Sequence, residues 1–175
     1  GGESTRPGAS PVRPEEELAR VIPVIEALRE VNPKGLISID TRRAPIATAA
    51  LDAGADMIND VSGLRDTRMR RLIVERGCAV CIMHMLGEPG DMQNDPSYDD
   101  VVNEVRENLL TVASELVGAG HPPELISLDP GIGFGKKLEH NLDLLRDPVW
   151  RETDRSGDAK PLPRRSCRCN SRFPE

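Results

Sequence analysis

The sequence predicts an α/β fold, in the form of a partial TIM (β/α)8 barrel with about four parallel strands. Two observations predict this fold. Short apolar segments alternate with segments of helical period along residues 14–146, and most of the apolar segments end on a polar residue. The alternation indicates a parallel sheet, and polar groups at strand ends are typical of a barrel. Because a full barrel has eight strands, we expect its N- and C-terminal parts to be missing here.

The expected helices show apolar residues at intervals of three and four. The first covers residues 14–29, with glutamates in its first turn and a kink expected at Pro23. Its buried stripe is expected to be Leu18, Ile22, Ile25 and Leu28. The other helices are expected within residues 41–55, 67–76, 97–117 and 138–145.

The expected strands are short apolar runs at residues 36–40, 55–60, 78–85 and 125–129. The run LISID at residues 36–40 is almost continuously apolar, so we expect it to be buried on both faces. The glycine-rich segment GIGFGKK fits neither the dinucleotide-binding template nor the P-loop template. A barrel is therefore favoured over an open nucleotide-binding sheet.

Composition excludes several classes of partner. A formal net charge of −6 gives no reason to expect nucleic acid, and no apolar run is long enough to cross a membrane. Cys78 and Cys81 lie three apart in an apolar run and would point to opposite faces of a strand, so we expect core packing. Cys167 and Cys169 have no histidine at zinc spacing. We expect a cytoplasmic protein.

Polar residues stand where the expected strands end. They are Asp40, Asn59, His84 followed by Met85, and Asp129. Each one alone is explained equally well as a helix cap. Together, two carboxylates and an amide suit a flat heterocycle with adjacent N–H and NH₂ groups. Ile132, Met85 and Phe134 could supply apolar walls, and no metal site is expected among these residues.

Five motifs occur in a specific order: GGESTRPG, SIDT, INDVSGL, CIMHM and LDPGIGFGK. In this order and at these spacings, residues 1–146 resemble dihydropteroate synthase. The resemblance implies condensation of 6-hydroxymethyl-7,8-dihydropterin diphosphate with 4-aminobenzoate, with release of pyrophosphate, in folate biosynthesis. These two small molecules would be the substrates, and a homodimer would be consistent with the family.

The resemblance also implies roles for particular residues. Asp40, Asn59 and Asp129 would hold the pterin ring, and Met85 and Phe134 would line its cleft. The residues of a mobile loop that completes the 4-aminobenzoate site would be Ser4, Thr5, Arg6 and Pro7. Asp40 would stabilise cationic character as pyrophosphate leaves, and Arg6 would contact an anionic group; these two are the expected catalytic residues.

The resemblance implies a Mg²⁺ cofactor as well, whose usual asparagine ligand would precede Gly1. The Ser-Arg-Lys and Arg-x-His motifs of the family are not found in this sequence. Residues 147–175 have no apolar period and are rich in Arg, Pro and Ser, so we expect a disordered tail outside the family pattern, consistent with an out-of-frame continuation.

Three functional interpretations remain open from the sequence. The chain is an enzyme fragment of the family, inactive or weak as it stands, or it is a non-catalytic pterin-binding module. A third interpretation is an adaptor that binds a polyanion through the arginines of its tail.

Overall fold

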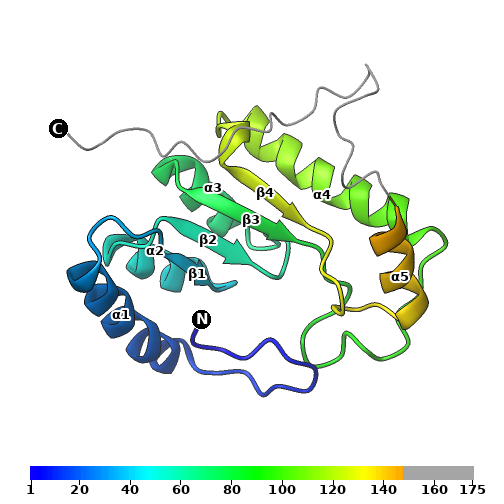
Figure 1. Cartoon of the computed structure of the whole chain (residues 1–175), viewed down its shortest axis with the longest axis horizontal. Coiled ribbons are helices and arrows are strands. Elements are labelled where there is room, and N and C mark those ends of the chain that lie inside the picture. The colour runs from blue at the N-terminus through cyan, green and yellow to red at the C-terminus, as the bar shows by residue number, and fades with distance from the viewer. Residues whose placement is uncertain (148–175) are drawn as a thin grey trace.

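The computed structural model describes residues 1–147 and contains one parallel sheet of four strands (Figure 1). The strands are β1 (Ser38–Asp40), β2 (Met57–Asp60), β3 (Ala79–Met83) and β4 (Ile126–Asp129). Their order in the sheet is β1-β2-β3-β4, the same as their order in the chain. A doubly wound sheet reverses its strand order at a switch point, whereas a barrel adds each strand beside the last. The sequential order therefore matches the predicted barrel.

The helices follow the predicted alternation closely. They are α1 (Pro14–Val31), α2 (Ala44–Asp52), α3 (Thr67–Arg76), α4 (Val101–Gly118) and α5 (Leu138–Arg146), with a short 3₁₀ turn at Pro123–Leu125. The start of α4 differs from the prediction because Asp100 caps the helix, accepting from Asn103 N at 3.2 Å. β3 ends at Met83, so His84 and Met85 follow the strand instead of ending it.

Helix α3 shows how local sequence sets both ends of an element. Asp66 accepts a hydrogen bond from the backbone N of Arg68 at 2.9 Å and caps the first turn. Gly77 ends the helix in the left-handed region, at φ 59°. The predicted inward residues Met69, Leu72 and Ile73 are all buried.

The two faces of the sheet differ in character. One face packs under the helices through Ile39, Ile58, Val80 and Ile82, which are almost fully buried. The other face carries a polar row that includes Asp40 and Asn59. The expectation that residues 36–40 are buried on both faces is therefore wrong. Ser38 is exposed and Leu36 is 69% exposed, because β1 is an edge of the described sheet and the helices cover one face of it.

The buried face of α1 is rotated from the predicted stripe. Ile25 is buried and Leu18 and Ile22 pack partly against the core, as expected, but Leu28 is 49% exposed. The fully covered positions are Glu17, Val21 and Ile25. The helix is continuous through Pro23, and the kink there stays a prediction.

The N-terminal segment runs along the carboxyl ends of the strands and approaches the loop between β3 and α4 (Figure 1). A hydrogen bond from Gly8 N to Pro89 O, 3.1 Å long, joins the two. The segment is thus placed at the edge of the sheet where a barrel site forms. Apart from Asp147, the predicted disordered tail at 147–175 lies outside the described residues, as do Cys167 and Cys169.

Candidate functional site at the carboxyl ends of the strands

Strand register brings the predicted pterin-binding residues onto one face. Asp40 is paired with Asn59, Asn59 with Cys81, and Cys81 with Ser127. Paired residues of neighbouring parallel strands project to the same side of a sheet. On the same face of the sheet, the next pair toward the carboxyl ends of the strands is Met83 with Asp129. The result is a polar row crossing four strands, with Asp129 one step above it.

Asp40 occupies a half-buried position in this row. Burial raises the pKa of its carboxyl group, while a hydrogen bond from Asn59 opposes the rise. The side chains of Asp40 and Asn59 are therefore hydrogen-bonded to each other. A carboxylate in such a setting is a strong acceptor for a cationic or N–H-bearing ligand edge.

Asp129 is oriented by the loop that follows it. Its Oδ1 accepts from the backbone N of Gly131 at 2.7 Å. This bond turns the side chain toward the glycine-rich loop 130–135. Asp40, Asn59 and Asp129, all three predicted from the sequence, thus lie on the same face of the sheet, at its carboxyl edge.

Two of the three residues of the predicted apolar wall, Met85 and Phe134, are brought together, whereas Ile132 is 39% exposed and lies outside their cluster. Met85 is 4% exposed and lies in a small cluster with Val61, Met83 and Met92, against which Phe134 packs. Met83, however, is the methionine in register with Asp129, and the sequence interpretation missed it. The alternation of side chains along a strand could have identified Met83, because positions 81 and 83 lie on the same face of β3 and position 81 is paired with Asn59.

The two strand cysteines separate as their spacing predicts, but their surroundings differ. Cys78 packs against the main core, and Cys81 lies in the polar row beside Ser127. Both are free thiols, and burial raises the pKa of each. The expectation of core packing is therefore correct for Cys78 and wrong for Cys81. Cys81 and Ser127 are paired in the sheet and are the two members of the polar row that follow Asn59.

The predicted residues of the N-terminal loop, 4–7, lie mostly at the surface. Ser4, Arg6 and Pro7 are exposed, and Thr5 is partly buried. The backbone of Arg6 bonds only within the loop, and its guanidinium has no ion-pair partner among residues 1–147. The structure therefore brings together the residues predicted to hold the pterin, whereas Arg6 lies exposed on the N-terminal segment.

Glu3, which the sequence interpretation passed over, anchors this loop. Its side chain is 9% exposed and accepts from Arg43 at 2.6 Å, from Arg42 at 3.2 Å and from the backbone N of Val12 at 2.8 Å. Burial alone would raise the pKa of Glu3, but these hydrogen bonds and charges hold it below its ordinary value. Glu17, 1% exposed, shares Arg43 and accepts from Thr41 Oγ1 at 2.7 Å.

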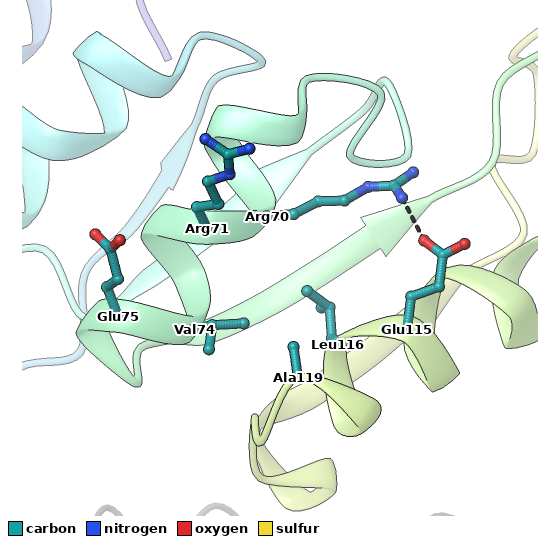
Figure 2. Close-up of a pocket in the computed structure, with 7 residues that line it drawn as sticks. All are labelled: Arg70, Arg71, Val74, Glu75, Glu115, Leu116 and Ala119. Atoms are coloured by element: carbon teal, nitrogen blue, oxygen red, sulfur yellow. Dashed lines mark hydrogen bonds and ion pairs between the residues drawn. The ribbon is translucent and has the colours of Figure 1, made fainter.

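Two surface cavities are found among the described residues, and neither is lined by Asp40, Asn59 or Asp129. The first, about 310 Å³, lies between α3 and α4 and is lined by Val74, Leu116 and the ion pair Arg70–Glu115 (Figure 2). The second, about 500 Å³, is bordered by four arginines, Arg42, Arg43, Arg65 and Arg68. Each of these arginines already pairs with a carboxylate, so the cavity offers little unbalanced positive charge.

Two sequence expectations concern metals and membranes. Within residues 1–147 no three His, Cys, Asp or Glu side chains gather in a way that could hold a metal ion. The Mg²⁺ cofactor implied by the resemblance stays a prediction. None of the helices in this part of the chain is long and apolar enough to span a membrane.

A parallel β/α sheet wound in sequential order, with a polar row at its carboxyl edge, is the architecture of part of a TIM barrel. Comparison with known proteins identifies the family. The chain belongs to the pterin-binding enzymes, matching the family described as "Pterin binding enzyme" over residues 1–148. The predicted family resemblance is confirmed.

Individual relatives are dihydropteroate synthases. The enzyme of Neisseria meningitidis serogroup C is 50% identical over 149 residues, which cover 83% of this chain and 52% of the relative. The Burkholderia cenocepacia dihydropteroate synthase complexed with 7,8-dihydropteroate superposes with a TM-score of 0.75 at 50% identity, covering 82% of this chain and 51% of that chain.

A third relative is the dihydropteroate synthase of Thermus thermophilus in complex with 4-aminobenzoate. It gives a TM-score of 0.76 at 44% identity and covers 83% of this chain and 54% of that chain. The chain thus spans about half the length of these three relatives. The solved structures of the Burkholderia and Thermus enzymes confirm the predicted barrel fold for the part that is shared.

Proposed function

We propose that this chain carries the pterin-binding half of a dihydropteroate synthase site. The reaction joins 6-hydroxymethyl-7,8-dihydropterin diphosphate to 4-aminobenzoate and releases pyrophosphate. The observation that supports this proposal is the polar row of Asp40 and Asn59 with Asp129 above it, on one face at the carboxyl edge of the sheet. The ligands named for the Burkholderia and Thermus relatives are the expected product and one expected substrate.

The proposed roles follow from the chemistry of each group. Asp129 accepts the paired N–H groups of the pterin edge, and Asn59 offers both an amide donor and an acceptor. Met83, Met85 and Phe134 cover the faces of the ring. Breaking the bond between the pterin methylene and the diphosphate oxygen sends the electron pair to pyrophosphate, and the carboxylate of Asp40 stabilises the cationic character left behind.

The loop residues complete the proposed site. The arylamine lone pair forms the new C–N bond and a proton is lost from that nitrogen, so positioning of 4-aminobenzoate matters more than a strong base. Arg6, exposed beside the site, is placed to meet an anionic group once the loop moves inward, with Ser4, Thr5 and Pro7 carried along. A homodimer and a cytoplasmic location, consistent with the free thiols of Cys78 and Cys81, are part of this proposal.

The experiment measures binding first and turnover second. The chain is titrated with 7,8-dihydropterin, whose fluorescence reports binding, and then incubated with the pterin diphosphate and labelled 4-aminobenzoate. Asp129→Asn is expected to weaken pterin binding about tenfold to a hundredfold, the size of a lost charge-assisted contact. Asp143→Asn, in an exposed pair with Arg146, is the matched control and is expected to bind as the unmodified chain does.

A second candidate is a non-catalytic pterin-binding module. It is favoured by one observation: strand register groups Asp40, Asn59 and Asp129, the residues expected to hold the pterin, whereas the expected catalytic Arg6 makes no hydrogen bond or ion pair with them among residues 1–147. Binding without formation of dihydropteroate supports the module, and binding with formation of labelled product supports the enzyme. If 7,8-dihydropterin does not bind, both are contradicted.

A further inference from the structure

A lysine ammonium is buried under the loop that follows β4. Lys136 is 3% exposed. Its Nζ donates to the backbone oxygens of Gly131 and Phe134, each at 3.0 Å, and to the oxygen of His84 at 3.3 Å, and it lies 3.1 Å from Nδ1 of the His84 ring. Four uncharged groups from two segments of the chain therefore surround one cation.

The neighbouring groups define the protonation states. Burial, Lys136 and Arg65 lower the pKa of His84 to about 4, so its ring is neutral and Nδ1 accepts from the ammonium. Burial lowers the pKa of Lys136 to about 8, and the charge of Asp129 opposes this shift. Tyr98, whose ring lies 6.1 Å from that of His84, has a pKa raised to about 12 by burial and stays neutral.

The backbone of the loop is shaped to surround the ammonium. Gly131 and Gly135 have φ of 67° and 62°. A Cβ on Gly131 would lie 2.0 Å from the oxygen of His84, and one on Gly135 would lie 2.4 Å from the oxygen of Leu86. The loop therefore packs directly on residues 84–86, and its carbonyl groups turn inward toward Lys136.

The same loop orients two residues of the candidate site. Gly131, whose oxygen bonds to Lys136, donates its N–H to Oδ1 of Asp129 at 2.7 Å. Phe134, whose oxygen also bonds to Lys136, donates its N–H to Gly131 O at 3.0 Å and packs against the methionine cluster. Through the backbone of the loop, the ammonium of Lys136 thus connects Asp129, which would hold the pterin edge, with Phe134, whose ring would cover the pterin face.

We propose that Lys136 is a positioning residue of the pterin site, and that its ammonium holds Asp129 and Phe134 in the geometry that binds the ligand. This inference rests on the proposed pterin-binding function. Lys136 does not touch the ligand; it acts through the carbonyls of Gly131 and Phe134. Loss of its charge weakens three or four hydrogen bonds at once, because charge-assisted bonds are the stronger ones.

The test compares two adjacent lysines. Lys136→Met removes the buried ammonium, and Lys137→Met removes an exposed ammonium that pairs with Asp95 at 2.7 Å. The dissociation constant of 7,8-dihydropterin is measured for both variants and the unmodified chain between about pH 7 and about pH 9.5. We expect about a tenfold weaker affinity for Lys136→Met at neutral pH, equal to the loss of one net hydrogen bond, and no change for Lys137→Met.

The pH profile separates positioning from a purely structural role. In the unmodified chain and in Lys137→Met the affinity is expected to fall as pH rises through the titration of Lys136, and in Lys136→Met this fall is absent. An affinity that is constant over this range in the unmodified chain, or an identical fall in all three proteins, overturns the inference. Since the profile is measured on the unmodified chain as well, the result stands even where Lys136→Met folds poorly.

A ligand-free measurement keeps this inference distinct from the proposed function. Amide hydrogen exchange of residues 129–135 is compared between Lys136→Met and Lys137→Met. Faster exchange confined to that segment in Lys136→Met supports the positioning role even if no pterin binds, in which case the proposed function alone fails. Equal exchange in both variants contradicts the positioning role directly.

Discussion

Asp40 carries the clearest pH dependence of the candidate site. Burial raises the pKa of its carboxyl group, so the carboxylate that a pterin would meet is lost at a higher pH than for an ordinary aspartate. We expect the affinity for 7,8-dihydropterin to fall as pH drops through this raised pKa. A titration of the dissociation constant checks the expectation, and Asp40→Asn should flatten the profile. If the affinity of Asp40→Asn still falls at the same acidic pH as that of the unmodified chain, the titrating group is not Asp40.

His121 makes a contrasting prediction about stability. Its ring is 2% exposed and neither ring nitrogen has a hydrogen-bond partner among the described residues, and burial lowers its pKa below 6.5. The unfolded chain therefore takes up a proton that the folded chain resists, and stability falls as pH drops below about 6.5. We expect His121→Leu to resist urea better than the unmodified chain at about pH 5, with a smaller difference at about pH 7.5. A constant difference at both pH values contradicts this.

At the scale of elements, the loop between β4 and α5 offers a matched pair of glycines. Gly131 and Gly133 both have positive φ, 67° and 84°, so alanine at either position meets similar backbone strain of about 1–2 kcal/mol. Only at Gly131 does the new Cβ collide with another segment, 2.0 Å from the oxygen of His84, whereas nothing lies within 4 Å at Gly133.

We therefore expect Gly131→Ala to lower the free energy of unfolding clearly more than Gly133→Ala, and to weaken 7,8-dihydropterin binding because Gly131 N also orients Asp129. Urea unfolding and ligand titration on both variants measure the difference. Equal effects of the two substitutions would show that the loop can move away from His84 at no cost.

The N-terminal loop depends on an anchor outside its predicted functional residues. Glu3 is mostly buried between Arg42 and Arg43, so Glu3→Gln removes a charge from two arginines and is expected to cost about 2 kcal/mol of stability. Glu16→Gln is the control, because the Glu16–Arg20 pair is exposed and should contribute about 0.5 kcal/mol at most. Similar losses in the two variants, measured by urea unfolding, would remove Glu3 from its anchoring role.

At the scale of the whole molecule, large apolar side chains are exposed beside both edge strands of the described sheet. Val31 ends α1 and Leu36 precedes β1 in the chain, and Leu138 and Leu145 lie on α5, which follows β4; their exposed fractions are 86%, 69%, 75% and 59%. Open sheet edges and apolar patches of this kind favour association. We expect the 175-residue chain to self-associate and to unfold irreversibly on heating.

Sedimentation velocity tests this prediction. The double variant Leu138→Lys with Leu145→Lys is expected to shift the chain toward the monomer, whereas Val117→Lys, at a 39% exposed position on α4, adds charge away from the edges and should change little. A monomeric unmodified chain with a reversible, cooperative melt would contradict the expectation.

The order of elements could be predicted from the sequence because it depends on local chemistry. The apolar period and Gly77 as a helix end act within a few residues along the chain, and the motif residues Asp40, Asn59 and Asp129 stand at strand ends. The caps Asp66 and Asp100 are local as well, but they were not predicted. The start of α4 differed from the prediction by four residues, because the Asp100 cap sets it, and the end of β3 differed by two residues.

What the sequence by itself determined was therefore the parallel β/α alternation, the polar strand ends and the family. Only the tertiary structure decided which face each side chain takes. It placed Cys81 and Met83 beside the predicted acids, buried Glu3 between two arginines and enclosed Lys136 under its loop. These facts depend on strand register and on contacts between residues far apart in the chain, such as the 52 positions that separate Lys136 from His84. Local pattern carries no information about such contacts, because their energies arise only after the segments pack.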